Sequence, residues 1–118
     1  MSELVPLASE RSAGGQVEFA GKKVTVQNLA DYDFAGVDIA FFSAGGSASR
    51  EHAPRAAAAG AVVIDNTSEF RYQDDIPLVV SEVNPHAIAQ YTTRNIIANP
   101  NCSTMGMLVA LAPIHRAV

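Results

Sequence analysis

The chain has 118 residues, a formal net charge of −4 at pH 7, 48% hydrophobic residues and a single cysteine. This length suits one domain with a modest core. The scattered basic residues argue against a nucleic-acid partner, no apolar run is long enough to cross a bilayer, and no signal-peptide pattern opens the chain. A lone cysteine excludes an internal disulfide. We therefore expect a soluble, cytoplasmic protein.

The first part of the chain predicts a strand followed by a hairpin. The apolar run from Leu4 to Ala8 predicts the strand, and a polar loop ending in glycine follows it. Period-two alternation over residues 17–19 and 24–26 predicts a hairpin around residues 20–23. Residues 28–34 are typical of a polar connection.

The middle of the chain predicts two buried strands around a helix. Residues 37–42 are nearly all apolar, which is typical of a strand buried on both faces. An alanine-rich helix is expected over residues 48–59, with its N-terminus or a kink near Pro54 and a C-cap at Gly60. Residues 62–65 predict the next buried strand.

The last part predicts two further strands and two helices. Residues 78–80 and 96–98 are the strand candidates, and Pro85 is expected to open a short helix to Gln90. The final helix is expected over residues 104–118, kinked or shortened at Pro113. Strands that alternate with helices across glycine-containing turns indicate an α/β fold with a mostly parallel sheet.

Polar loops follow four of the predicted strands, at Ser9, Ser43, Asn66 and Asn101. Ligands bind at the carboxyl ends of the strands in parallel sheets, where successive loops meet. The sequence therefore predicts that these four loops gather at one edge and form a site.

The segment Asn99-Pro100-Asn101-Cys102-Ser103-Thr104 places the only cysteine on a strand-to-helix turn. Asn-Pro marks the turn, and asparagine and serine are residue types that cap helices. The positive end of a helix dipole favours thiolate over thiol, so Cys102 is a candidate nucleophile. The alternative is a small buried cysteine that packs as alanine does.

Two loops carry features that suit phosphate groups. The turn from Ser43 to Ser47 joins a strand to a helix and contains a glycine pair, an arrangement in which backbone amides can hold phosphate. Arg11 lies between Ser9 and Ser12, and an arginine after the second strand of a dinucleotide fold accommodates the 2′-phosphate of NADP. Glu10 leaves NAD possible, and a solvated loop is the alternative.

Other titratable residues give weaker signals. Arg71 follows a buried strand and suits a planar, bidentate anion such as phosphate, although an ordinary surface arginine also fits the pattern. His52, His86 and His115 show no metal-ligand spacing, so no metal is expected. No pair of acids is indicated as catalytic.

With these segments in order, the sequence resembles the aspartate-semialdehyde dehydrogenase family. The resemblance rests on five stretches that span essentially the whole chain: residues 8–14, 42–47, 63–71, 77–85 and 97–104. Ser81 and Gly106 depart from it, since the family usually has proline and glutamine there.

The resemblance implies the following roles. Cys102 would be the nucleophile, Asn101 its neighbour at the reacting group, and Arg71 the group that binds substrate phosphate. The NADP contacts would come from Ser9, Arg11, Ser12, Ser43, Ala44, Gly45 and Asn66. The implied reaction is the NADPH-dependent reductive dephosphorylation of aspartyl 4-phosphate to the semialdehyde through a cysteine thioester, in lysine, threonine and methionine biosynthesis.

The resemblance also implies an incomplete Rossmann-like domain. Residues 1–118 would form a partial dinucleotide-binding domain that lacks its first βα unit and ends in the helix bearing the nucleophile. The substrate and dimerisation domain would be absent, and the full-length enzyme would be a homodimer or a dimer of dimers. We expect little or no activity from the chain alone. The alternatives are an N-acetyl-γ-glutamyl-phosphate reductase and a non-catalytic nucleotide-binding remnant.

Overall fold

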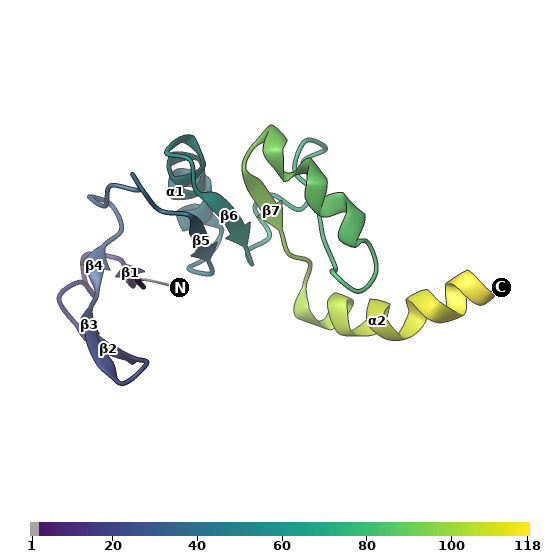
Figure 1. Ribbon diagram of the computed structural model, residues 1–118, viewed down its shortest axis with the longest axis horizontal. Helices are drawn as coiled ribbons and strands as arrows, with labels where there is room; N and C mark the ends of the chain where they lie inside the picture. The colour runs from purple at the N-terminus through teal and green to yellow at the C-terminus, as the bar shows by residue number, and fades with distance from the viewer. Residues whose placement is uncertain (1–2) are drawn as a thin grey trace. The chain divides into compact units, whose positions relative to one another are not determined.

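The computed structural model describes residues 3–118, and the chain divides into two compact units. Unit 1 extends to Asp33, and unit 2 runs from Phe34 to Val118. Figure 1 labels the α-helices and the strands of both units.

Unit 1 contains four short strands. β1 (Leu7–Ala8) pairs in parallel with β4 (Gln27–Asn28), whereas β2 (Gln16–Phe19) and β3 (Lys22–Thr25) form an antiparallel hairpin. The predicted hairpin is confirmed. The predicted first strand is reduced to its last two residues. β4 was not predicted, and its second residue, Asn28, is the first residue of the segment expected to be a polar connection.

The hairpin turn requires an unusual backbone. Ala20 has φ 50° and Gly21 has φ 74°, so both central residues of the turn are left-handed. Such turns match the twist of a hairpin and favour asparagine followed by glycine. Alanine at the first position therefore adopts a conformation that its side chain disfavours.

Unit 2 is built on a parallel sheet with the strand order β5-β6-β7. Its strands are β5 (Ile39–Phe42), β6 (Val62–Asp65) and β7 (Ile96–Ala98), as Figure 1 shows. The segment expected as a strand at residues 78–80 forms only a single parallel bridge, from Leu78 to Ala98. The predicted α/β architecture with a parallel sheet is confirmed.

The expectation that the first strand of this sheet is buried on both faces is wrong. Ile39 is 55% exposed and Phe41 75% exposed, whereas Phe42 is buried and its ring centroid lies 6.4 Å from that of Phe34. Side chains alternate between the faces of a strand, so Ile39 and Phe41 share one face. Helix α1 (Gly46–Ala58) contacts β5 and β6. The exposure of Ile39 and Phe41 shows that nothing in unit 2 covers the face that these two side chains share.

A glycine lies just outside each end of helix α1. Gly45 has φ 95° and precedes the first turn, and Gly60 has φ 100° and follows Ala59. The N–H of Gly60 donates to Ala57 O and the N–H of Ala61 to Ala56 O, which is a Schellman motif. Pro54 lies inside the helix and does not mark its start, because the turn at Gly45 already sets the N-terminus.

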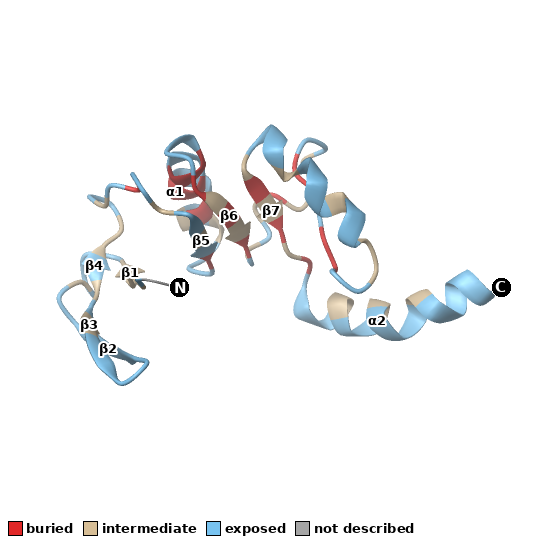
Figure 2. Cartoon of the chain, viewed as in Figure 1, coloured by how far each residue is buried: buried red, intermediate tan, exposed pale blue. Residues whose placement is uncertain are grey.

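The remaining elements are the 3₁₀ helix η1 (Pro85–Thr93) and helix α2 (Cys102–Ala117). Both start close to their predicted positions. η1 ends later than predicted, and α2 continues through Pro113. Figure 2 shows that burial concentrates on α1, β6 and β7, whereas no residue of α2 is buried among the described residues.

Candidate functional site

The three strands of unit 2 deliver polar residues to one edge of the sheet. Ser43 follows directly after β5, Asn66 after β6 and Asn99 after β7. The N–H of Asn66 donates to Phe42 O at 2.8 Å, and the N–H of Asn99 donates to Asp65 O at 2.8 Å. These bonds continue the sheet pairing into the loops. The predicted convergence is therefore found for the three loops of unit 2, whereas Ser9 belongs to unit 1.

Cys102 is the first residue of α2, and its thiol is exposed. Asn101 caps the helix: its Oδ1 accepts from Ser103 N at 2.9 Å, and its carbonyl oxygen accepts from Met105 N at 3.0 Å. The first N–H groups of a helix lack intrahelical partners and carry a partial positive charge. The predicted strand-to-helix turn is confirmed. The alternative of a buried structural cysteine is wrong, since the thiol is open to solvent.

Arg71 is fixed by backbone carbonyls. Its Nε donates to Asn99 O at 2.8 Å and its Nη2 donates to Asn66 O at 3.0 Å. None of the ion pairs among residues 3–118 involves Arg71, so its charge is not neutralised by a carboxylate there. The guanidinium has five N–H groups. Those not used on the two carbonyls are left to meet an anion.

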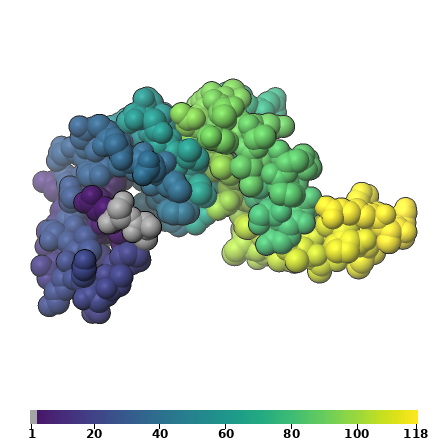
Figure 3. Space-filling model, in the orientation of Figure 1, coloured from purple at the N-terminus to yellow at the C-terminus, as the bar shows by residue number. Residues whose placement is uncertain are grey.

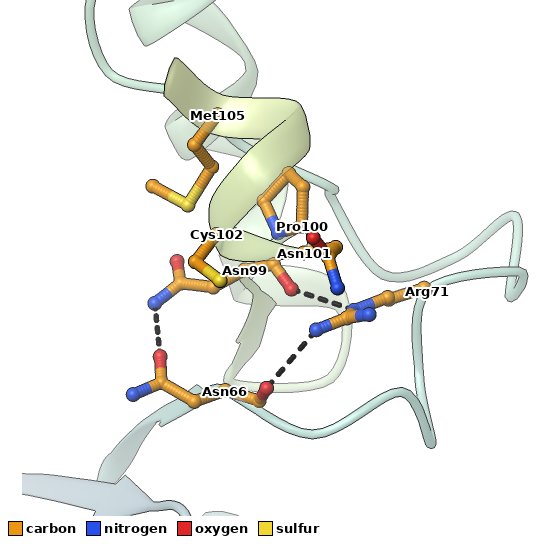
Figure 4. A pocket seen from close by; sticks show the side chains of 7 residues that line it. All are labelled: Asn66, Arg71, Asn99, Pro100, Asn101, Cys102 and Met105. Atoms are coloured by element: carbon orange, nitrogen blue, oxygen red, sulfur yellow. Dashed lines mark hydrogen bonds between the residues drawn. The ribbon is translucent and has the colours of Figure 1, made fainter. Parts of the chain in front are cut away.

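A pocket of about 380 Å³ brings the cysteine and the arginine together. Figure 4 shows both side chains beside the Asn66 and Asn99 side chains, which are hydrogen-bonded to each other. The complete lining is Asn66, Arg71, Asn99, Pro100, Asn101, Cys102 and Met105. A thiol, a fixed guanidinium and several amides suit a substrate that carries an electrophilic carbon next to an oxyanion.

The structure separates the predicted residues into three groups. Asn66, Arg71, Asn101 and Cys102 line the pocket. Ser43, Ala44 and Gly45 form the exposed β5–α1 turn and do not line it. Ser9, Arg11 and Ser12 lie in an exposed turn of unit 1, in which the N–H of Ser12 donates to Ser9 O at 2.9 Å.

The sequence reasoning missed Asn99 as a site residue. Its carbonyl holds Arg71, its amide nitrogen donates to Asn66 Oδ1, and it lines the pocket. The available signal was its position as the first residue after β7, next to a proline that forces an extended backbone.

The β5–α1 turn has properties that suit a phosphate-bearing cofactor. No side chain caps the start of α1, so its first backbone N–H groups remain open, and no atom lies within 4 Å of a Cβ built on Gly45. Glycine allows a ligand to approach the backbone, and a helix N-terminus favours phosphate. These residues therefore fit a dinucleotide. No group of three metal-ligating side chains lies close enough together to hold a metal within residues 3–118.

An ion pair joins helix α1 to the loop that follows β6. Arg50 on α1 donates from Nε to Glu69 Oε1 at 2.8 Å and from Nη2 to Oε2 at 2.9 Å. These hydrogen bonds, followed by the attraction of opposite charges, lower the pKa of the Glu69 carboxyl. Glu69 is thus bound to α1 and does not compete for Arg71.

Comparison with known proteins gives consistent matches. A family model described as "Semialdehyde dehydrogenase, NAD binding domain" matches residues 1–91. The chain is 64% identical over 118 residues to aspartate-semialdehyde dehydrogenase 2 of Vibrio cholerae, covering 100% of this chain and 35% of that protein. The chain thus spans about a third of the length of this curated relative.

Solved structures agree. Aspartate semialdehyde dehydrogenase II of Vibrio cholerae, complexed with ASA, matches with a TM-score of 0.96 and 64% identity over 99% of this chain and 38% of that chain. The Candida albicans aspartate semialdehyde dehydrogenase with NADP matches with a TM-score of 0.77 and 25% identity, covering 98% of this chain and 40% of that chain. No helix within residues 3–118 has the length and hydrophobicity to cross a membrane.

Proposed function

Because the chain belongs to the family of semialdehyde dehydrogenase NAD-binding domains, we propose that it is part of an NADP-dependent aspartate-semialdehyde dehydrogenase. The proposed reaction is the reductive dephosphorylation of aspartyl 4-phosphate in the biosynthesis of lysine, threonine and methionine. The observation that carries the proposal is the pocket in which an exposed thiol and a carbonyl-anchored arginine meet. A cytoplasmic location and a full-length enzyme that is a homodimer or a dimer of dimers belong to the same proposal.

The first step requires a nucleophile and a place for the leaving phosphate. The Cys102 thiolate attacks the acyl carbon, a C–S bond forms, and the bond from that carbon to the phosphate oxygen breaks. Arg71 binds the phosphate before and after it leaves, because its remaining N–H groups present a fork that matches two phosphate oxygens. Covalent catalysis divides one difficult displacement into two easier steps.

The oxyanion that develops in this attack needs hydrogen-bond donors. Backbone N–H groups of the first turn of α2 are donors of this kind, and the helix dipole acts in the same direction. Asn101 keeps that turn formed by accepting from Ser103 N. The same turn therefore positions Cys102 and stabilises the intermediate.

The thioester is then reduced. The nicotinamide cofactor, when bound, supplies the hydride. The residues that would hold it are Ser43, Ala44 and Gly45 at the start of α1, together with Asn66. Ser9, Arg11 and Ser12 of unit 1 would bind the 2′-phosphate that distinguishes NADP. The Cys102 thiolate leaves from the reduced carbon and is restored.

The acylation step can be tested on the 118-residue chain. The chain is mixed with freshly generated aspartyl 4-phosphate, and phosphate release and the mass of the Cys102 peptide are followed. We expect stoichiometric phosphate release with an acyl adduct on Cys102, and neither in Cys102→Ser. If Cys102 reacts with a thiol reagent but never acquires the acyl adduct, the proposal is overturned. Faster acylation by N-acetyl-γ-glutamyl 5-phosphate would assign the chain to that reductase instead.

A further inference from the structure

The loop that carries Asn66 and Arg71 begins at a buried carboxyl group. Asp65, the last residue of β6, is 0% exposed. Its Oδ1 accepts from Ser49 Oγ at 2.7 Å and from Thr67 N at 3.3 Å, and its Oδ2 accepts from Thr67 Oγ1 at 2.8 Å. One side chain therefore joins helix α1 to the loop after β6.

Because Asp65 is buried, water cannot replace these hydrogen bonds. Among residues 3–118 no cation forms an ion pair with Asp65, so its carboxyl oxygens depend on hydroxyl and amide donors. Removing a partner from a buried polar group costs more than the average worth of a hydrogen bond, because the group is left without water. The backbone at Thr67 is thus confined to positions from which it reaches Asp65.

The restraint on the backbone at Thr67 also affects Arg71, because the peptide units on either side of Asn66 connect the two. Asn66 lies between Asp65 and Thr67, and its carbonyl oxygen accepts from Arg71 Nη2 at 3.0 Å. The other acceptor of Arg71 is Asn99 O, and Asn99 N donates to Asp65 O. Both carbonyls that hold the guanidinium are therefore one residue or one hydrogen bond away from Asp65. Figure 4 shows the two carbonyls converging on Arg71.

We propose that the cluster Ser49–Asp65–Thr67 is a positioning device that aims Arg71 at the phosphate of the substrate. The cluster does not touch the pocket, whose lining includes none of its three members. It sets the carbonyl acceptors of Arg71, and so determines the affinity for phosphate without contributing to the reactivity of Cys102. This inference rests on the proposed function, which makes Arg71 the phosphate ligand.

The test measures phosphate binding without turnover. Inorganic phosphate bound by Arg71 occupies the pocket shared with Cys102, so it slows alkylation of the thiol by iodoacetamide. The concentration of phosphate that halves this rate reports its affinity. The alkylation rate without phosphate, and the melting temperature, are recorded for each variant of the full chain.

Thr67→Val removes the hydroxyl but keeps the shape. The variant loses the hydrogen bond that the hydroxyl donates to Asp65 Oδ2 and the one that it accepts from Glu69 N. We expect phosphate protection to weaken by about tenfold, the order expected for lost hydrogen bonds of this kind. Alkylation without phosphate should match the wild type. Thr67→Ser keeps the hydroxyl and should restore protection, whereas Ser68→Ala, at the exposed next residue, should change nothing. Asp65→Asn should resemble Thr67→Val where it folds.

The outcomes separate this inference from the proposed function. If phosphate protects neither the wild type nor Arg71→Ala, the phosphate site itself is wrong. If it protects the wild type but not Arg71→Ala, while Thr67→Val is protected as well as the wild type, only the positioning role is overturned. A Thr67→Val variant that loses protection together with a large fall in melting temperature, without rescue in Thr67→Ser, would also contradict it.

Discussion

The Arg71 Nε atom donates a 2.8 Å hydrogen bond to the carbonyl oxygen of Asn99, which lies 28 residues further along the chain. This bond links the loop after β6 to the loop after β7, directly before the turn that carries Cys102. The guanidinium is therefore oriented before any anion arrives.

Arg71→Lys tests whether this orientation matters. A lysine keeps the charge but lacks the planar fork, so it cannot hold both carbonyls and also present two parallel donors. We expect phosphate protection of Cys102 to weaken by more than about tenfold, which corresponds to ~1.4 kcal/mol. Arg94→Lys is the matched control, because Arg94 forms only an exposed ion pair with Asp75. Equal protection in wild type and Arg71→Lys would show that charge alone suffices.

Asn101→Ala tests the helix cap beside the nucleophile. Loss of the side-chain acceptor for Ser103 N should cost about 1 kcal/mol of helix stability. The first turn of α2 should then fray, so that Cys102 loses its fixed position and the ordered amide groups beside it. We expect slower alkylation of Cys102 than in wild type, with Asn101→Ser close to wild type. An unchanged alkylation rate in Asn101→Ala would show that the cap has no effect on the reactivity of the thiol.

The Glu69–Arg50 pair predicts a pH dependence. Since folding lowers the pKa of Glu69 below its ordinary value of 4.5, the pair stabilises the fold above that value and the contribution is lost as the pH falls through the lowered pKa. Glu69→Gln should lower the melting temperature at neutral pH, and the difference should vanish in acid. Asp74→Asn, an exposed change in the same segment, should give no such pattern. A constant difference across pH would contradict the assignment.

The Ala20-Gly21 turn predicts a stabilising substitution. Asparagine tolerates the left-handed conformation better than alanine does, so Ala20→Asn should raise the free energy of unfolding by about 0.5–1 kcal/mol. Urea denaturation measures the change. Ala20→Val should destabilise the hairpin, because a β-branched residue is disfavoured at φ 50°. The reverse order of the two variants would rule out backbone strain.

The 118-residue chain alone should give little or no NADP-dependent turnover. None of its three histidines, His52, His86 and His115, lines the pocket of Cys102, so no imidazole is available there as a general acid or base. An assay with NADP, phosphate and aspartate semialdehyde checks this expectation. Appreciable turnover that disappears in Cys102→Ser would refute it.

Local signals predicted the parts of the site that depend on neighbours in sequence. The Asn-Pro-Asn-Cys-Ser order was sufficient to place Cys102 at the start of α2, and the apolar run 62–65 matched β6 residue for residue. Asn99 and the Asp65 cluster depend on contacts across many residues, which no local pattern contains. The error at β5 has the same origin: an apolar run indicates that a strand can be buried, whereas burial also requires another layer, and Phe41 has none within unit 2.

Helix α2, which begins at Cys102, is weakly packed against the rest of unit 2. It has no buried side chain, its Gly106 has no neighbouring atom within 4 Å of a Cβ, and Leu111 and Ile114 are 47% and 59% exposed. Figure 3 shows the yellow end of the helix extending beyond the neighbouring green segment, and near this end Arg116 Nη2 donates to Val83 O at 2.8 Å. A helix with so little tertiary support opens at low cost. In the 118-residue chain its amides should therefore exchange with deuterium far sooner than those of β6, and the backbone N–H groups beside Cys102 should be ordered only for the fraction of time that the first turn is closed.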